Sequence, residues 1–185
     1  GMGANVTILE KNVERMRELE RLFRGRARTV ASNPHHVAEA VRRADLLIGA
    51  VLLPGARAPR VVTEEMVRSM KPGSVIVDIA VDQGGCVETV DRATTHENPV
   101  YVKHGVIHYA VANIPGAVPR TATLALTQAT IDYVLELADG GLERALANPA
   151  LAAGVNIHGG VAAHPKVAEA VDLPYVPPDR LPVTT

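Results

Sequence analysis

Four short apolar runs, separated by helix-length segments, constrain the fold of this chain more than any other feature. The runs cover residues 5–9, 27–31, 45–52 and 74–80 and consist mostly of aliphatic and β-branched residues. Runs of this length and composition predict buried strands. Each intervening segment is long enough to return the chain to the same end of a sheet through a crossover helix. The alternation therefore predicts an α/β fold with a mainly parallel sheet.

The segments between the runs contain helix signals. Asn12 can cap a helix whose apolar residues recur at three- and four-residue spacing, and Pro34 can open a second helix. Thr63 can cap a third helix, which a Lys-Pro-Gly sequence then ends. Two further strands are predicted near residues 100–102 and 107–110.

The pattern changes after the Pro115-Gly116 pair. A long amphipathic helix is predicted over residues 121–138, because apolar side chains form one stripe there: Leu124, Ile131, Val134, Leu135 and Ala138. The remainder is predicted to form helical fragments and a proline-rich end with little strand character. We therefore expect one domain over residues 1–120 and a second part over residues 121–185.

The composition excludes several classes of function. Hydrophobic residues make up 47% of the chain and aromatic residues only 3%, which is typical of aliphatic strands covered by helices. The formal net charge of -1 gives no electrostatic footprint for nucleic acid or for an anionic membrane. The single cysteine, Cys86, excludes an internal disulfide and fits a reducing compartment. There is no apolar run of ~20 residues and no signal-peptide pattern, so we expect a cytoplasmic protein.

Two acidic residues that follow predicted strands are candidates for a site. A carboxylate at the end of a strand, such as Glu10, can accept hydrogen bonds from the ribose of a bound dinucleotide. Most acids at such places are solvated loop residues, and this alternative stays open for Glu10. Asp82 comes just after a continuous apolar strand, at the edge where open α/β sheets bind ligands. It can orient water or an amine, or transfer a proton, and a purely structural role is the alternative.

Other reactive residue types give weaker signals. Gly84 and Gly85 allow either a close approach of the backbone to a ligand or a turn with positive φ angles. His104 and His108 have a spacing that can bind metal, but no cysteine or carboxylate completes the set, so we expect structural histidines and no metal. Cys86 has no basic neighbour in the sequence that would lower its pKa, which predicts an inert thiol.

Several stretches resemble the alanine dehydrogenase family, which is related to the nucleotide-binding part of proton-translocating transhydrogenases. The most specific are Asp82-Gln83-Gly84-Gly85 and the run Ala112-Asn113-Ile114-Pro115-Gly116-Ala117-Val118-Pro119. The resemblance covers essentially the whole chain, and its other matching runs are residues 6–10, 44–55, 70–80, 109–121, 148–151 and 173–175.

The resemblance implies reversible oxidative deamination of L-alanine to pyruvate and ammonium, with hydride transfer to NAD. It also implies a Rossmann-type doubly wound parallel sheet, followed by the C-terminal helical part of a substrate domain, in a homo-oligomer that is a hexamer. Asp82 takes the place of the catalytic aspartate, and it also lies among the cofactor contacts. Glu10 takes the place of the ribose-binding acid, which is usually Asp. The other cofactor contacts implied are Arg15, Ser32, Val51, Leu52, Ile79, Ala80, Val81, Arg92, Val111, Ala112, Asn113 and Ile114.

One part of the family pattern is missing from the sequence, the Gly-x-Gly-x-x-Gly fingerprint. Residues 1–4 match the end of the helix that follows this fingerprint in the family. The first strand, the fingerprint and the preceding half of the substrate domain are therefore expected to be absent. The missing strand is the middle one in the usual Rossmann order, so its two neighbours would have free edges. We expect the chain alone to bind NAD weakly or not at all and to have no dehydrogenase activity.

Two other functions remain open. The first is a transhydrogenase-like nucleotide-binding subunit that works for a membrane partner, although the transhydrogenase relatives have a non-acidic residue at the position of Asp82. The second is a non-catalytic α/β assembly protein that keeps the sheet without the fingerprint. A glycine fingerprint upstream of Gly1 would favour the enzyme.

Overall fold

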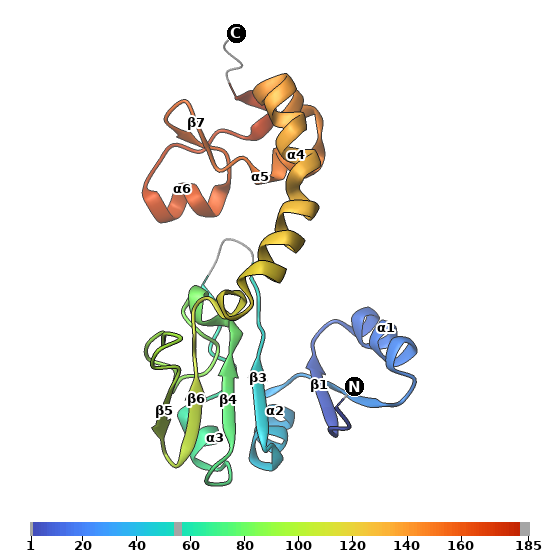
Figure 1. The fold of residues 1–185 in the computed structure, drawn as a ribbon, viewed down its shortest axis with the longest axis vertical. Coiled ribbons are helices and arrows are strands. Elements are labelled where there is room, and N and C mark those ends of the chain that lie inside the picture. The colour runs from blue at the N-terminus through green and yellow to red at the C-terminus, as the bar shows by residue number, and fades with distance from the viewer. Residues whose placement is uncertain (1, 54–56, 182–185) are drawn as a thin grey trace. The chain divides into compact units, whose positions relative to one another are not determined.

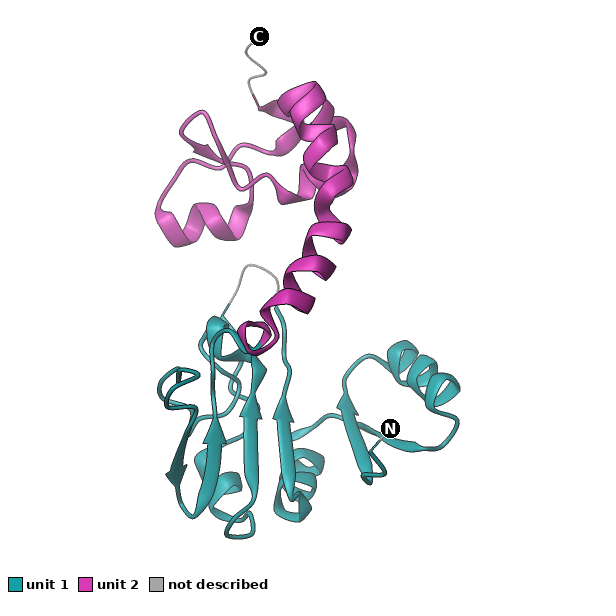
Figure 2. Ribbon diagram, in the orientation of Figure 1, with its two compact units in different colours: residues 1–53, 57–114 teal, residues 54–56, 115–185 magenta. Residues whose placement is uncertain are grey.

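The computed structural model describes residues 2–53 and 57–181 and divides into two compact units (Figure 1 and Figure 2). Unit 1 comprises Gly1–Leu53 and Arg57–Ile114, and unit 2 contains Pro115–Thr185. Pro54 and Gly55 of the run over residues 44–55, and Gly1 of the stretch over residues 1–4, lie outside the described residues.

A two-stranded parallel sheet begins unit 1. It consists of β1 (Val6–Glu10) and β2 (Ala27–Ala31), joined by helix α1 (Val13–Phe23). The Asn12 side chain caps α1, because it accepts a hydrogen bond from the Arg15 amide at 3.1 Å. The predicted strand–helix–strand unit is confirmed here.

A four-stranded sheet with the order β3-β4-β6-β5 forms the centre of unit 1 (Figure 1). Strands β3, β4 and β6 are parallel, and β5 pairs antiparallel with β6. The predicted α/β class with a parallel sheet is therefore confirmed. The elements are α2 (Pro34–Arg43), β3 (Leu46–Gly49), α3 (Glu64–Arg68), β4 (Val75–Asp78), β5 (Val100–Lys103) and β6 (Val106–Tyr109).

The strand predicted over residues 74–80 is shorter than its apolar run. It ends at Asp78, whose side chain accepts a hydrogen bond from the Ala80 amide at 3.0 Å and starts the 3₁₀ helix η1 (Ile79–Gln83). The run over residues 45–52 likewise ends as a strand at Gly49. An apolar run indicates burial, whereas a bond between a side chain and the local backbone decides where a strand stops.

Helices α2 and α3 cover one face of the four-stranded sheet. Val41 of α2, Val67 of α3, and Ile76 and Val106 of the sheet pack in one cluster, and each is at most 3% exposed. Leu9 of β1 packs against the same cluster, so the two-stranded sheet shares this core. Each such burial contributes roughly 1.5–3 kcal/mol.

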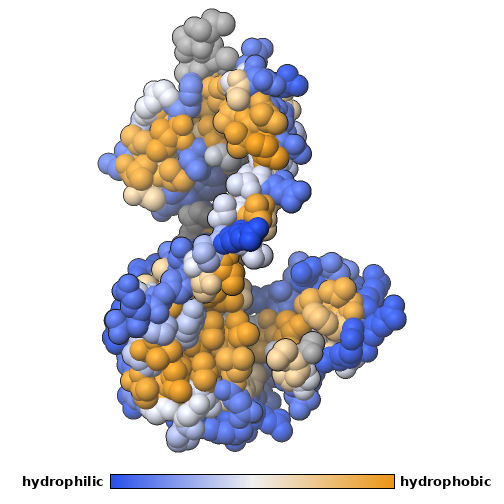
Figure 3. Space-filling view, viewed as in Figure 1, coloured by the Kyte–Doolittle hydropathy of each residue, from blue (hydrophilic) through white to orange (hydrophobic). Residues whose placement is uncertain are grey.

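The opposite face of the four-stranded sheet is apolar and largely exposed (Figure 3). We call it the open face, and strand alternation and register assign to it Leu46, Ile48, Val75, Val77, Val100, Val102, Ile107 and Tyr109. Its outer residues are the most exposed, with Ile48 at 57% and Val102 at 66%. Aliphatic runs covered by helices are expected to be buried on both faces. That expectation is wrong for these residues, because the central ones are only half-buried and the outer ones are exposed.

Unit 2 is built on the long helix α4 (Pro119–Ala147), which is broken at Gly141, where φ is 57°. Two very short antiparallel strands appear where little strand character was expected. The other elements are η2 (Ile114–Ala117), α5 (Pro149–Gly154), β7 (Ile157–His158), β8 (Val161–Ala162), α6 (Pro165–Val171) and η3 (Pro178–Arg180). The division between the units falls slightly before residues 120 and 121, and the assignment of the two parts to particular domains stays a prediction.

Helix α4 has apolar side chains on two sides rather than along one stripe. At ~100° per residue, Leu126 and Leu137 lie opposite the predicted stripe that contains Leu124 and Ile131. All four side chains are at least 47% exposed. Helices that are apolar all round are normally buried, so α4 has more apolar surface than unit 2 itself covers. No helix in the described ranges is long and apolar enough to cross a membrane.

Candidate active site

The carboxyl ends of β3, β4 and β6 bring three predicted cofactor segments to one edge of the sheet. Val51 and Leu52 follow β3, the η1 residues Ile79, Ala80, Val81 and Asp82 follow β4, and Val111, Ala112, Asn113 and Ile114 follow β6. The three strands are adjacent and parallel, so these segments share an edge. Leu52 is 66% exposed and Ile79 is 50% exposed. This is the edge at which open α/β sheets bind ligands.

Asp82 has an exposed side chain in η1. Within the part of the chain that the structure describes, this carboxylate has no hydrogen bond or ion pair. The next residue, Gln83, has a buried side-chain oxygen, Oε1, without a partner among the described residues. The Asp82 carboxylate is therefore available to a ligand at this turn.

Gly84 and Gly85 close η1 in a conformation that favours glycine. Their φ angles are 92° and 77°, and their amides donate hydrogen bonds to the carbonyls of Val81 and Ala80 at 3.0 and 2.9 Å. A Cβ on Gly85 would lie 2.9 Å from Asp78 Oδ2. Of the two roles considered for this pair, the structure shows the turn with positive φ angles. The backbone of the turn lies close to the buried carboxylate of Asp78.

Asp78 lies fully buried beneath this turn. Its Oδ1 accepts a hydrogen bond from the Ala80 amide at 3.0 Å, and its Oδ2 accepts from the amides of Cys86 and Val87 at 2.8 and 3.1 Å. Burial and the nearby Asp78 charge raise the pKa of the Cys86 thiol to about 11. This supports the interpretation of Cys86 as an inert thiol. The role of Asp78 was not predicted from the sequence, because the residue lies inside the apolar run that precedes Asp82.

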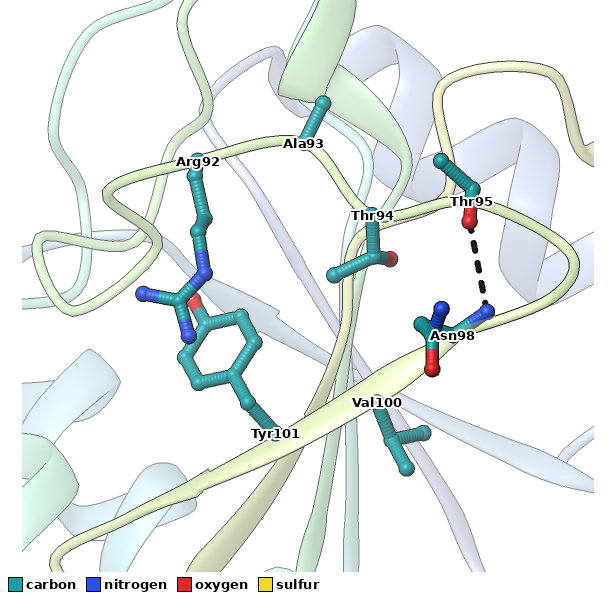
Figure 4. A pocket seen from close by; sticks show the side chains of 7 residues that line it. All are labelled: Arg92, Ala93, Thr94, Thr95, Asn98, Val100 and Tyr101. Atoms are coloured by element: carbon teal, nitrogen blue, oxygen red, sulfur yellow. Dashed lines mark hydrogen bonds between the residues drawn. The ribbon is translucent and has the colours of Figure 1, made fainter.

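Arg92 lies beside β5 on the rim of a pocket of about 300 Å³, which Thr95, Asn98 and Tyr101 also line (Figure 4). Its guanidinium carbon is 4.2 Å from the centroid of the Tyr101 ring, and one of its nitrogens is 3.1 Å from an oxygen of Asp91. The side chain remains 61% exposed. The cation–π contact thus holds a positive charge at the surface, where a ligand can reach it.

The residues predicted to bind the adenosine part lie on the two-stranded sheet. Glu10 ends β1, and its Oε1 accepts hydrogen bonds from the next two backbone amides at 2.6 and 2.9 Å. Ser32 follows β2 and donates its amide hydrogen to the Glu10 carbonyl at 2.9 Å, so these two residues are neighbours. The Arg15 side chain instead pairs with Glu18 at 2.5 Å on the exposed surface of α1.

The two histidines with metal-like spacing are engaged by protein groups. His104 pairs with Glu64 at 2.7 Å, and this hydrogen bond is the main reason that the pKa of Glu64 is lowered. His108 is fully buried: its Nδ1 is 2.9 Å from the Val106 carbonyl, and its Nε2 is 2.7 Å from the Thr89 hydroxyl. The described residues contain no group of three His, Cys, Asp or Glu side chains that could hold a metal ion.

Two arginines that no sequence pattern indicated lie against the glycine turn. A Cβ on Gly84 would lie 2.7 Å from Arg57 Nε, so the Arg57 side chain covers that glycine. Arg60 donates hydrogen bonds to the carbonyls of Val87 and Val90 at 2.6 and 3.3 Å. These contacts depend on how two loops fold beside each other, which local sequence does not encode.

Comparisons with known proteins identify the family. Residues 1–165 match a family model described as "Alanine dehydrogenase/PNT, C-terminal domain". An alanine dehydrogenase of Lysinibacillus sphaericus is 57% identical over 182 residues, which is 98% of this chain and 49% of that protein. The alanine dehydrogenase of Bacillus subtilis (strain 168) is 56% identical over 97% of this chain and 48% of its own length. The chain spans about half the length of the curated relatives that it matches.

Solved structures have the same fold. A structure of L-alanine dehydrogenase matches with a TM-score of 0.81 and 50% identity, over 92% of this chain and 47% of that one. A transhydrogenase from Sinorhizobium meliloti matches with a TM-score of 0.67 and 31% identity, over 88% of this chain and 43% of that one. With the family model matching most of its length, this chain belongs to the alanine dehydrogenase/PNT family.

Proposed function

We propose that this chain supplies the cofactor-binding half of an enzyme that converts L-alanine to pyruvate and ammonium with NAD as the oxidant. The observation that supports this most strongly is the free Asp82 carboxylate at the ligand-binding edge of the sheet, in a chain 57% identical to an alanine dehydrogenase. The complete reaction is proposed for an assembly that also includes the half of the relatives that this chain does not match.

The residues at the sheet edge fit a pyridine nucleotide. The exposed side chains of Leu52 and Ile79 offer an apolar surface to a flat ring. Glu10 uses only Oε1 for its own backbone, which leaves Oε2 for ribose hydroxyls. Its negative charge disfavours a 2′-phosphate, so NAD is the proposed form. When bound, the nicotinamide ring supplies a hydride acceptor.

Asp82 is proposed as the catalytic residue. Its carboxylate orients the substrate amine and the water, takes a proton from that water as its oxygen bonds to the carbon, and returns the proton to the nitrogen as the carbon–nitrogen bond breaks and ammonium leaves. The other residues proposed as cofactor contacts hold the ring and ribose from the ends of β3 and β6, with Arg92 as an additional positive charge at the rim.

We also propose that the two sheets of unit 1 are parts of one Rossmann-type doubly wound sheet. Strands β1 and β3 each pair on one side only, and a parallel strand between them would pair with both. The sequence contains no Gly-x-Gly-x-x-Gly, and the relatives are about twice as long as this chain. The strand and its phosphate-binding turn would therefore come from the unmatched half.

We also propose the division into two domains, the location and the oligomeric state that the sequence predicts. Residues 1–120 form the cofactor domain and residues 121–185 a part of the substrate domain, in a cytoplasmic homo-oligomer. The open face and the two apolar sides of α4 are surfaces of the kind that oligomers and neighbouring domains cover. Mass measurement of the assembled enzyme by light scattering tests the proposed hexamer.

The test joins this chain to the unmatched half of the Lysinibacillus sphaericus relative, either as a fusion or by co-expression. We call this assembly the complete enzyme. It is expected to form NADH from NAD only when L-alanine is present, and to use the 2′-phosphorylated cofactor much less efficiently. A folded assembly that lacks this activity, or that instead passes hydride between two dinucleotides, contradicts the proposal.

The variant Asp82→Asn tests whether Asp82 takes part in the reaction. In the complete enzyme it should lower turnover about 10²- to 10⁴-fold and leave NAD affinity unchanged, because it keeps the size of the side chain and removes its charge. Asp45→Asn is the matched control, since Asp45 pairs with Lys71 at the opposite end of β3. Unchanged turnover of Asp82→Asn would remove Asp82 from the reaction.

A further inference from the structure

The loop that contains Asp82 is held at both of its ends. It leaves the sheet at the end of β4, passes through η1 and the glycine turn, and ends at Val87. Val87 is fully buried and forms a parallel bridge with Val62. The side chain of Asp82 lies between these points and has no hydrogen bond among the described residues. Its position therefore depends on how firmly the two ends of the loop are held.

One buried side chain holds both ends. The two oxygens of Asp78 accept different backbone amides: Oδ1 accepts from the Ala80 amide at the start of the loop, and Oδ2 accepts from the Cys86 and Val87 amides at its end. Oδ1 also accepts from the Cys86 thiol at 3.6 Å. Hydrogen bonds from backbone amides to a carboxylate are stronger than those to a neutral acceptor. Asp78 is 0% exposed, so water does not compete for its oxygens.

The packing around Asp78 fixes the carboxylate in place. A Cβ on Gly49 would lie 2.5 Å from Cys86 Sγ and 3.4 Å from Asp78 Oδ1. A Cβ on Gly85 would lie 2.9 Å from Asp78 Oδ2 and 3.2 Å from Arg60 Nη1. Both glycines therefore stand where a larger residue would push the carboxylate or the loop aside. Little space is left for the Asp78 side chain to shift.

We propose that Asp78 is a positioning residue, which places Asp82 for the reaction by tying the start of the catalytic loop to its end. The inference rests on the proposed function, because the placement of Asp82 matters only if the reaction takes place at this edge. A displacement of ~1 Å of a reacting group can lower a rate by ~10²-fold. The hydrogen bonds of one buried residue can therefore have a large effect on catalysis without that residue touching the substrate.

The variant Asp78→Asn separates the two ends of the loop. An asparagine has the same size but only one acceptor oxygen, so it can hold the start or the end of the loop, and its amide nitrogen then faces the donors of the other end. Ser74→Ala is the matched control. Ser74 is also buried, precedes the same strand at its far end, and loses one hydrogen bond, from its hydroxyl to the Ala44 carbonyl at 3.3 Å.

The first measurement is amide hydrogen exchange on this chain. Asp78→Asn should speed exchange at one end of the loop, at Ala80 or at Cys86 and Val87, by about 10-fold or more, because the hydrogen bonds that protect these amides are lost there. Ser74→Ala should leave these three amides unchanged. Unchanged exchange at all three amides in Asp78→Asn would overturn the proposal.

The second measurement is the kinetics of the complete enzyme. Asp78→Asn should lower kcat by about 10- to 100-fold and leave KM for NAD unchanged, whereas Ser74→Ala should leave both values unchanged. Faster amide exchange in the loop of Asp78→Asn together with a normal kcat would overturn the proposal. An equal loss of kcat in both variants would also overturn it. An inactive parent enzyme contradicts the proposed function instead, and exchange at the three amides still shows whether Asp78 holds the loop.

Discussion

The two faces of the four-stranded sheet are made from alternating residues of the same strands, yet they differ sharply. On the covered face, Ile76 and His108 are fully buried and Asp78 has a hydrogen bond to each oxygen. On the open face, Val77 is half-buried and Ile48 is 57% exposed. The comparison shows that the more apolar face of a sheet can be the one that the surrounding elements leave uncovered, because the covered face carries the polar residues Asp78 and His108.

The two faces also differ in the part of the enzyme that they support. The covered face supports the loop that contains Asp82, and its hydrogen bonds are made by residues of this chain alone. The open face, the free edges of β1 and β3 and the apolar sides of α4 lack such partners among the described residues. We therefore expect substitutions on the covered face to lower the stability of the chain alone. Substitutions on the open face should lower stability only in the assembled enzyme.

The largest expected difference is between two isoleucines. Ile76→Ala should lower the free energy of unfolding by about 2–5 kcal/mol, because it leaves a cavity in the core. Ile48→Ala removes the same atoms from the open face and should change it by less than ~0.5 kcal/mol. Urea denaturation of the chain measures both variants. Equal losses would mean that the open face is covered in solution, and a larger cost of Ile48→Ala in the complete enzyme would show that the other half covers it.

A smaller difference is expected between two glycines. Gly85 and Gly73 have φ angles of 77° and 85°, so alanine meets a similar backbone strain at both. A Cβ at Gly85 would meet Asp78, whereas a Cβ at Gly73 has nothing within 4 Å. Gly85→Ala should therefore destabilise the chain by about 1–3 kcal/mol more than Gly73→Ala. If thermal unfolding shows the same loss for both variants, the carboxylate is not held as tightly as its contacts indicate.

The smallest effect concerns pH. Burial lowers the pKa of His108 below its ordinary value of 6.5, and Lys103 and His104 lower it further, while the hydrogen bond to the Val106 carbonyl and the charge of Asp91 oppose them. The unfolded chain therefore binds the proton more readily, so the stabilisation is complete above about pH 6.5 and is lost as the pH falls toward the folded pKa. His108→Gln should reduce the slope of the melting temperature against pH between about pH 8 and pH 5. The exposed control His35→Gln should keep the wild-type slope, and a wild-type slope in His108→Gln would exclude His108 as its source.

Local sequence was sufficient for the order of strands and helices in unit 1, although β3 and β4 end earlier than their apolar runs. The strands β1 and β2 lie within a residue of the predicted ranges and α2 begins at Pro34 as predicted, because these patterns and caps act over a few residues. Asp82 and Glu10 could be selected because an acid after an apolar strand is a signal that one sequence can show. The neighbouring positions of Glu10 and Ser32 follow from the parallel pairing of β1 and β2.

Contacts between distant segments could not be predicted. Asp78 looks like the end of a strand in the sequence, and its role appears only when Cys86 and Val87 fold back over it. Arg57 lies over Gly84 for a similar reason. The single stripe predicted for α4 was incomplete because residues such as Leu126 lie on its opposite side and remain exposed.

We propose that the nucleotide site is shared between this chain and the half of its relatives that it does not match. Calorimetric titration of NAD into the chain alone and into the complete enzyme tests this most directly. We predict weak or no binding by the chain alone, micromolar binding by the complete enzyme, and a loss of that affinity in Glu10→Ala. Micromolar binding of NAD by the isolated chain would contradict the account.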